Sequence, residues 1–402
     1  MANTNTTVDL RNKFLIVESA LNDEIFERHT EIRGLLLAVL SRKHIFLLGE
    51  PGLAKSFLLE RFVRRLNGID ETNGLFIRQI FKTTNDSELF GPYAISKLEQ
   101  DRYERITEGR LPGATFAFLD EIGNGSSSIL AGLLRIMQER KFENGPDVNP
   151  DVPLITLMSA SNSLFPAELS ALSDRFHLRF NVQPLRDESA LAQMLLAQVE
   201  PNPEKVLSIT DIEAAQIEVG NVKIGDEIIS TLLKIKEQLA VENITISDRR
   251  LKQSIDVLRA SAWLNGNSEA QIEDITPLQN MFWKEIPEIS KVRNIVCGLS
   301  DPLEAQIVET LENFNMAFAE FERNYAETDD PTRKSDIGFE VLQKWNAAKR
   351  ETVEYSQVQA DTGRLYRSLS VLKKRLRDTI VVIVEEGLKG NVKEEDVADL
   401  VD

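Results

Sequence analysis

The chain has 402 residues, more than one hydrophobic core usually holds, so two or three domains are expected. It has 47 basic and 64 acidic residues, and the resulting charge of −17 disfavours binding to nucleic acid or to anionic lipid. One cysteine excludes a disulfide within the chain, and the three histidines are too far apart in sequence to form a local zinc-ligand pattern. No apolar run reaches ~18 residues and no signal-peptide pattern is found, so a cytoplasmic protein without a membrane partner is expected.

Helices and buried strands alternate in the first half of the predicted structure. Residues 21–40 have apolar side chains at helical spacing, and 44–48 form a short apolar run that ends at a glycine. Four further runs of this kind are predicted as buried strands: 75–80, 115–119, 154–160 and 178–182. Helices are expected between them at 56–66 and 128–138. This alternation predicts an α/β fold with a mostly parallel, doubly wound sheet.

The second half is predicted to be helical, with no convincing strand after Pro184. Three amphipathic helices are expected, at 211–219, 226–238 and 249–263. From residue 277 onward the pattern is again helical, with breaks expected at 298–302, 329–331 and 387–390. We therefore predict three domains: an αβα domain at 1–195, an all-α domain at 196–285 and a helical C-terminal module at 286–402.

A glycine-rich loop, GEPGLAKS at 49–56, lies between the first predicted strand and the next helix. Small residues let backbone N–H groups surround an anion, the lysine can reach terminal phosphates, and the serine hydroxyl can bind Mg²⁺. The expected nucleotide-binding residues are Gly49, Glu50, Pro51, Gly52, Leu53, Ala54, Lys55, Ser56 and Phe57. The alternative is a glycine-rich turn without a ligand.

Ala54 departs from the usual loop pattern, which has glycine immediately before the lysine. Alanine resists a positive φ. Two outcomes therefore stay open: the backbone is helical at Ala54, or the loop is slightly distorted there.

Two adjacent carboxylates, Asp120 and Glu121, follow the apolar sequence FAFL. They are expected at the carboxyl end of a strand, the edge where ligands bind in parallel sheets. Neighbouring residues of a strand face opposite sides, so the two side chains have different surroundings. We assign Asp120 to Mg²⁺ and Glu121 to activation of the attacking water. The alternative is a pair that caps the next helix or lies in solvent.

Taken together, these segments resemble the AAA+ ATPases, more narrowly their MoxR branch, and within it the RavA-type regulatory ATPases. The resemblance rests on ERHTEIR (27–33), FLLGEPGLAKS (46–56), ELFGP (88–92), RYERITEGRLP (102–112), FLDEI (118–122), LLRIMQERKFENG (133–145), SASN (159–162), LSDRF (172–176) and ISDRRLKQSIDVLRASAW (246–263). It implies a P-loop NTPase core with Walker A and Walker B motifs, an all-α lid, ATP and Mg²⁺ as cofactors, and a homo-hexameric ring with shared active sites. Beyond about Trp283 it fades.

The resemblance also implies two further catalytic residues. Asn162 corresponds to the sensor that positions water or the terminal phosphate, and the alternative is an asparagine that bonds its own turn. Arg175 corresponds to the arginine finger that enters the neighbouring subunit's site. A local pair with Asp174, or the same role for Arg179, is the alternative.

Arg249 corresponds to the second sensor, which contacts the terminal phosphate bound to its own chain and reports its loss as lid rotation. Arg250 is the alternative, because the sequence does not fix the helix phase, and both arginines could also lie on a solvated face. In this family the adenine rests near 27–33, so His29 is a candidate adenine contact, with a surface helix as the alternative.

Two hairpin insertions are implied, within 91–112 and at 141–153, facing the pore or one rim of the ring. The second contains Asn144 and Gly145, a strong hairpin-turn signal. Ordinary surface loops are the alternative. A basic cluster near the C-terminus is more typical of a solvated helix face than of a nucleic-acid contact: Lys373, Lys374, Arg375 and Arg377.

The function implied by the resemblance is ATP-driven, chaperone-like remodelling of protein complexes. The partners implied are other copies of the chain, a protein client, and a separate chain with a von Willebrand A domain. A helicase-type nucleic-acid motor is one rival, which the acidic charge balance disfavours. An ATP-binding scaffold with little turnover is the other, which the intact set of predicted catalytic residues disfavours.

Overall fold

The computed structural model describes residues 4–69, 73–145, 149–185, 188–197, 202–300, 302–327 and 330–358, together with Leu376 and Thr379. The chain divides into two compact units, Met1–Val296 and Cys297–Asp402. No helix within the described ranges is long and apolar enough to cross a membrane.

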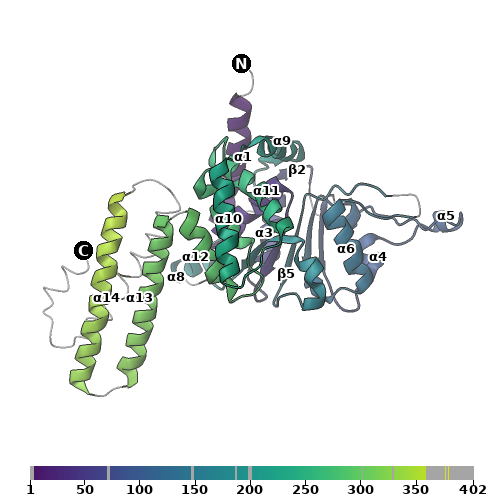
Figure 1. Ribbon diagram of the computed structural model, residues 1–402. Coiled ribbons are helices and arrows are strands. Elements are labelled where there is room, and N and C mark those ends of the chain that lie inside the picture. Colours follow the sequence, from purple (N-terminus) through teal and green to yellow (C-terminus); the bar gives the residue numbers. More distant parts are fainter. Residues whose placement is uncertain are drawn as a thin grey trace. The chain divides into compact units, whose positions relative to one another are not determined.

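Five parallel strands form the central sheet of the first unit, in the order β3-β4-β5-β1-β6 (Figure 1). They are β1 (His44–Leu48), β3 (Leu75–Gln79), β4 (Phe116–Asp120), β5 (Thr156–Ser161) and β6 (Phe176–Asn181). Every residue of β1 and of β5 is buried, as expected where helices cover both faces of a parallel sheet. The predicted α/β fold is confirmed, and each predicted strand lies within about two residues of its observed bounds.

Helices α3 (Lys55–Val63) and α6 (Ser127–Glu139) are the two predicted between these strands. Phe46 and Leu119 of the sheet share one apolar core with Leu133 and Ile136 of α6. Ser126 caps α6 by accepting a hydrogen bond from the backbone N–H of Ile129 at 3.4 Å. Because this core fixes the strands side by side, the residues that follow their carboxyl ends meet along one edge.

The single helix predicted at 21–40 is wrong. The chain forms α1 (Thr4–Glu24) and then α2 (His29–Ser41), separated by a turn in which Glu27 has a φ of 53°. Arg28 closes the turn: it is buried, and its Nη2 donates to the carbonyl of Gln183 at 2.7 Å. Apolar spacing continues through the turn, so the pattern alone could not reveal the break.

The three predicted amphipathic helices are confirmed as α9 (Ile209–Asn221), α10 (Asp226–Val241) and α11 (Asp248–Asn265). A 3-10 segment, η4 (Ile272–Asn280), follows them and includes Pro277. The chain also forms α8 (Glu188–Leu196) and α4 (Asp86–Phe90), which were not predicted. The two-residue strand β7 (Leu207–Ser208) pairs with β2 (Leu66–Asn67), which corrects the expectation of no strand after Pro184. Such a strand is too short to give a periodic signal.

Helix α1 connects the phosphate-loop helix to the helices that follow the sheet. Glu24 pairs with Arg61 of α3 at 2.6 Å and with Arg65 at 2.7 Å. Lys13 pairs with Asp211 of α9 at 3.0 Å. These ion pairs join α1 to residues between the strands and to a helix that follows the last strand of the sheet. This agrees with a first unit that extends to Val296.

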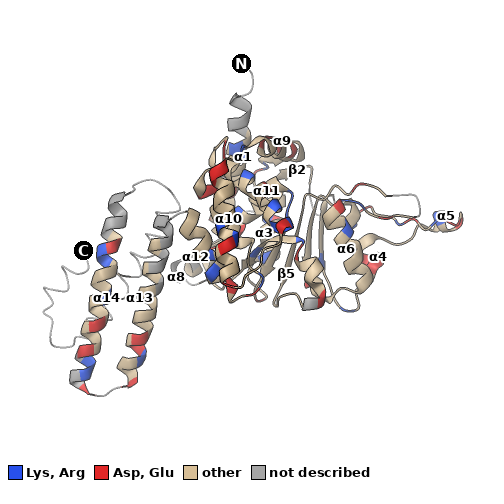
Figure 2. Ribbon diagram, in the orientation of Figure 1, with Lys and Arg blue, Asp and Glu red and all other residues tan. Residues whose placement is uncertain are grey.

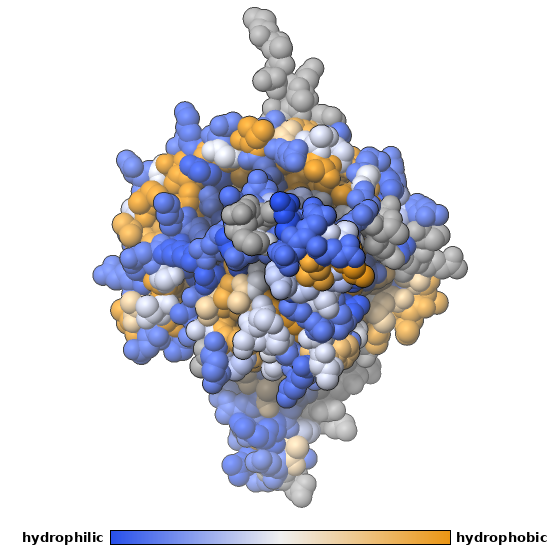
Figure 3. Space-filling view, turned by 90° about the vertical axis from the view of Figure 1, so that its right-hand side faces the viewer, coloured by the Kyte–Doolittle hydropathy of each residue, from blue (hydrophilic) through white to orange (hydrophobic). Residues whose placement is uncertain are grey.

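Both predicted insertions are present. In the first, Tyr93 and Arg105 form an antiparallel bridge, with the short helix α5 (Ile95–Leu98) between them; in the second, Lys141 bridges Asp151. Asn144 joins the two insertions, because its side chain accepts from the Arg105 N–H at 2.6 Å and donates to the Arg105 carbonyl at 3.1 Å. Figure 3 looks at this side of the molecule, where apolar side chains lie among hydrophilic ones. Large exposed apolar residues of the first insertion include Ile95, Tyr103 and Ile106.

The described helices of the second unit are the end of α12 (Glu288–Ser300), α13 (Pro302–Glu327) and α14 (Pro331–Val358). They confirm the breaks predicted at 298–302 and 329–331. Phe314, Phe318 and Trp345 pack in a separate core, and Figure 2 shows both signs of charge along α13 and α14. The break predicted at 387–390 and the basic cluster at 373–377 lie outside the described residues.

Candidate active site

The predicted phosphate loop leaves the carboxyl end of β1 and leads directly into α3. Gly49 begins it by donating its N–H to the Ser161 carbonyl at 3.0 Å, and Gly52 has a φ of 85°, which favours glycine. Among the described residues, no side chain caps the start of α3, and the first turn contains no acidic residue. The N–H groups of that turn are therefore available to an anion.

Ala54 takes a left-handed conformation, with φ 58° and ψ 26°. Of the two outcomes left open, the structure therefore shows the distorted loop, because α3 begins only at Lys55. This conformation costs an alanine about 1 to 2 kcal/mol. Ala54 is thus the last residue before the helix, and α3 begins directly after it.

Lys55 lies between the loop and the two predicted carboxylates. Its Nζ donates to the carbonyl of Gly49. Partial burial lowers the pKa of Lys55, and the charges of Asp120 and Glu121 raise it, although burial dominates. Burial likewise raises the pKa of Asp120, which Lys55 lowers in turn. These mutual effects require the ammonium and the carboxylates to be close together.

The carboxylate of Glu121 is held against the end of β5. Ser161 Oγ donates to one of its oxygens at 3.0 Å, and the backbone N–H of Asn162 donates to the other at 3.2 Å. Glu121 itself has a φ of 53°, a conformation that non-glycine residues rarely adopt and that is often found at functional sites. Sequence reasoning missed Ser161, although it lies within the SASN segment.

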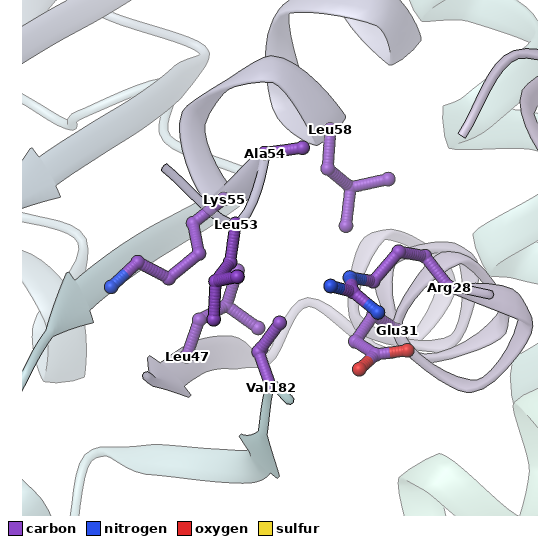
Figure 4. Close-up of a pocket in the computed structure, with 8 residues that line it drawn as sticks. All are labelled: Arg28, Glu31, Leu47, Leu53, Ala54, Lys55, Leu58 and Val182. Atoms are coloured by element: carbon purple, nitrogen blue, oxygen red, sulfur yellow. The ribbon is translucent and has the colours of Figure 1, made fainter. Parts of the chain in front are cut away.

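A small pocket adjoins the loop on the side of α2 (Figure 4). Its lining residues are Arg28, Glu31, Leu47, Leu53, Ala54, Lys55, Leu58 and Val182. Burial raises the pKa of the Glu31 carboxyl, whereas the charge of nearby Arg28 lowers it. His29 is exposed instead, with its Nδ1 2.5 Å from Asn22 Oδ1. The charged side chains that line the pocket are therefore Arg28, Glu31 and Lys55, and His29 is not among the lining residues.

The groups at this edge fit a magnesium nucleotide. Uncapped helix N–H groups and Lys55 suit phosphate oxygens, while the Ser56 hydroxyl and the Asp120 carboxylate are the oxygen ligands that Mg²⁺ prefers. The neighbouring pocket has apolar walls, but its volume of about 10 Å³ is too small to hold a base in this conformation.

Arg175 lies at the opposite edge, because it immediately precedes β6. Its Nη1 donates to the Ala171 carbonyl at 2.7 Å and its Nη2 to Gln138 Oε1 at 2.6 Å. Partial burial lowers the pKa of this guanidinium, and so does the nearby charge of Arg249, whereas the charge of Asp174 raises it. Asp174, the alternative partner, lies 3.8 Å from Arg250.

Arg179 and Arg250 are buried and bind backbone carbonyls. Arg179 donates to Ser173 at 2.7 Å and to Trp283 at 3.1 Å, and burial lowers its pKa to about 9. Arg250 donates to the Phe176 carbonyl at 3.2 Å. Neither guanidinium is free to reach a phosphate, so Arg179 does not fit the finger and Arg250 does not fit the second sensor.

Arg249 is exposed at the start of α11 and lines a hollow with Lys43. Lys43 precedes β1 whereas Gly49 follows it, so this hollow and the phosphate loop lie at opposite edges of the sheet. The expectation that Arg249 contacts a phosphate bound to its own chain conflicts with this geometry. Arg249 instead lies near Arg175, whose pKa its charge lowers.

Comparisons with protein families give two matches in succession along the chain. Residues 12–221 match the family described as the MoxR domain in the MoxR-vWA-beta-propeller ternary systems. Residues 227–296 match the AAA lid domain. Together the two matches cover most of the first compact unit and end at its last residue, Val296.

Individual relatives agree with the family matches. An uncharacterized protein of Methanocaldococcus jannaschii is 36% identical over 306 residues, which are 76% of this chain and 79% of that protein. The chaperone MoxR1 of Mycobacterium tuberculosis is 24% identical over 307 residues, 71% of this chain and 75% of its own. A crystal structure of a proposed ATPase from Cytophaga hutchinsonii matches with a TM-score of 0.60 at 18% identity, over 73% of this chain and 95% of that one. At that identity the structure supports the fold alone.

Proposed function

Because the chain belongs to the MoxR family of AAA+ ATPases, we propose that it hydrolyses ATP in a ring, with each active site shared by two copies. One observation carries the proposal: the phosphate loop and Glu121 lie at the carboxyl edge of the sheet, while Arg175 and Arg249 lie at the amino edge. One copy cannot bring both sets to one nucleotide. A head-to-tail neighbour can, since such contacts close into rings.

At the carboxyl edge, Lys55 exchanges its bond to the Gly49 carbonyl for the terminal phosphates, beside the uncapped N–H groups of α3. Ser56 and Asp120 would hold Mg²⁺, which neutralises phosphate charge when bound. Glu121 accepts a proton from the attacking water. Its carboxylate is already oriented by Ser161 and by the backbone of Asn162, whose carboxamide then positions the water.

At the amino edge, the neighbour's Arg175 and Arg249 supply positive charge to the transition state. The assignment of Arg249 therefore changes from its own chain's phosphate to that of the next copy. For the base, the position of the pocket favours Arg28 and Glu31 over His29 as polar contacts.

The output we propose is chaperone-like remodelling of a protein client in the cytoplasm. The family description, which names MoxR, vWA and beta-propeller components together, supports a partner chain with a von Willebrand A domain. The relative called chaperone MoxR1 supports the chaperone role. The two joined insertions, with exposed Ile95 and Tyr103, are the surface we assign to client contact. A closer relation to RavA-type ATPases stays a prediction.

The test is specific ATPase activity across a wide range of protein concentration, for the wild type, Glu121→Gln and Arg175→Ala. Activity per subunit is expected to rise with concentration, and each variant to lose turnover by about 10³-fold while still binding ATP. Flat activity with a silent Arg175→Ala would instead indicate a monomeric ATPase. Tight ATP binding without hydrolysis at any concentration would indicate a scaffold.

A further inference from the structure

A basic hollow of about 550 Å³ lies at the amino edge of the sheet, against α11. Its lining residues are Lys43, Arg249, Lys252, Gln253, Ile255, Asp256 and Arg259. Four of the seven are cations and one is a carboxylate, in a chain whose charge is −17. The volume lies within the range of about 300 to 1,000 Å³ that is typical of small-molecule sites.

The cations of the hollow differ in what they bind. Lys43 pairs with Asp256 at 2.7 Å, and Arg259 Nε donates to the Val222 carbonyl at 3.1 Å. Arg249 and Lys252 are exposed, and within the described part of the chain neither makes a hydrogen bond or an ion pair. Two cations are thus available to an anion from outside the chain.

The two available cations are next to each other on one face of the helix. Lys252 follows Arg249 by three positions on α11, and residues three apart lie on the same side of a helix. Arg175 immediately precedes β6 and so lies at the same amino edge, near enough to Arg249 for that charge to lower the pKa of Arg175. Like charges in one place repel each other. The arrangement is therefore most favourable with a polyanion bound.

We propose that this hollow receives the polyphosphate of the nucleotide bound to the neighbouring copy, and that Lys252 is a third cation that contacts it, beside Arg175 and Arg249. The proposal rests on the proposed function and extends it to a residue that the family resemblance did not indicate. The occupant is a second copy of this chain, carrying its nucleotide at the carboxyl edge.

Lys252 is expected to act mainly on nucleotide binding. An ammonium is a point charge that attracts phosphate in the ground state and in the transition state alike, so its loss weakens uniform binding. Lys252→Ala should therefore raise the KM for ATP about tenfold, and kcat should change less than about threefold. Lys252→Arg keeps the charge and should stay within about threefold of the wild type in both constants.

The first experiment measures KM and kcat of the full chain at a protein concentration where activity per subunit is maximal. The matched control is Lys234→Ala, an exposed lysine of α10 outside the hollow. The KM and kcat of Lys234→Ala are expected to equal those of the wild type. The melting temperatures of both variants are also expected to be unchanged. A KM for Lys252→Ala equal to that of the wild type would overturn the proposal.

The second experiment tests whether Lys252 acts on the neighbour. Lys252→Ala is mixed with an excess of Glu121→Gln, whose own site does not turn over but whose Lys252 is intact. Most working sites then face an intact hollow, so the KM should return to the wild-type value. A KM that stays raised would place the action of Lys252 within its own chain and overturn the proposal.

These outcomes separate the inference from the function on which it rests. Wild-type turnover that rises with concentration, combined with a silent Lys252→Ala, overturns the inference and leaves the shared-site ATPase standing. No wild-type turnover at any concentration overturns both.

Discussion

The two edges of the parallel sheet handle charge in different ways. At the carboxyl edge, Lys55 lies near Asp120 and Glu121, and its ammonium bonds the Gly49 carbonyl. At the amino edge, Arg175 and Arg249 lie close together, and no carboxylate in the described ranges forms an ion pair with either.

This difference teaches what each edge needs. The carboxyl edge combines its cation with carboxylates of the same chain and can be held ready in an isolated copy. The amino edge has surplus positive charge, which an external anion would stabilise. An edge with surplus charge is more sensitive to assembly than an edge without it, and the following substitutions test that distinction.

The largest effect is expected from Lys55→Ala compared with Arg249→Ala. Lys55→Ala should abolish ATP binding by dilute, unassembled chains, because the loop loses its only side-chain cation. Arg249→Ala should leave that binding unchanged and reduce turnover of assembled chains by about 10³-fold. Fluorescent-ATP titration at low concentration and ATPase assays at high concentration measure the two effects. Equal loss of binding in both variants would break the comparison, because Arg249 would then act in its own chain.

Ser161→Ala probes the orientation of Glu121 at the carboxyl edge. It removes the hydroxyl that donates to the carboxylate at 3.0 Å. A hydrogen bond to a charged group contributes about 1.5 kcal/mol or more, so kcat should fall about tenfold with little change in KM. Ser163→Ala, two residues on and exposed, is the matched control and should be silent. An unchanged kcat for Ser161→Ala would show that the Glu121 carboxylate needs no such support.

Glu24→Gln tests the ion pairs behind the phosphate loop. Removing one partner from largely buried pairs with Arg61 and Arg65 should lower the free energy of unfolding by about 3 kcal/mol. Chemical denaturation measures it, with exposed Glu237→Gln as a control expected to change less than about 0.5 kcal/mol. Loss of ATPase activity without loss of stability would contradict the structural role.

The same variant changes the pH dependence of stability. Burial alone would raise the pKa of Glu24, but Arg61 and Arg65 outweigh it and hold the pKa below the usual 4.5. For a carboxyl with a lowered pKa, the stabilisation is present above the unfolded value and is lost as the pH falls through the folded one. Wild-type stability should therefore fall more steeply below pH 4.5 than that of Glu24→Gln.

The smallest effect is expected from Ala54→Gly. Glycine relieves the left-handed strain but gains freedom in the unfolded chain, so the net stabilisation should be about 0.5 to 1 kcal/mol. Ala94→Gly, at a φ of −73°, is the matched control and should be destabilising by a similar amount. Thermal unfolding distinguishes the two signs. A destabilising Ala54→Gly would show that the loop's conformation is not strained.

The sequence located strands and loop well because their signals are local. The run 44–48 ends at Gly49, and the observed β1 has the same bounds. The order of the strands in the sheet could not be predicted in this way. The residue pattern of a strand indicates that the strand is buried, but it does not indicate which strand pairs with it. For the same reason the resemblance assigned Arg175 to the neighbour's site and Arg249 to the site of its own chain, although both lie at the opposite edge from Gly49.

Choices between adjacent residues also needed the structure. Arg249 and Arg250 differ by about 100° around α11, and only packing shows that Arg250 faces the core. Similarly, the turn at Glu27 determines that Arg28 rather than His29 faces the pocket beside the loop. A periodic pattern does not show which of two adjacent residues at the start of a helix faces the core. Nor does it show which residue of a turn faces a pocket.

Arg250 has a mechanical consequence. Its guanidinium bonds the Phe176 carbonyl of β6 as well as the Met281 carbonyl after η4, and it is 4% exposed. Rotation of α11 on the sheet would leave this buried cation without partners, at a cost of several kcal/mol. We therefore expect the first unit to resist rotation of α11 on the sheet. In the proposed ring, we therefore expect movement between neighbouring copies, where Arg175 and Arg249 of one copy approach the phosphate loop of the next.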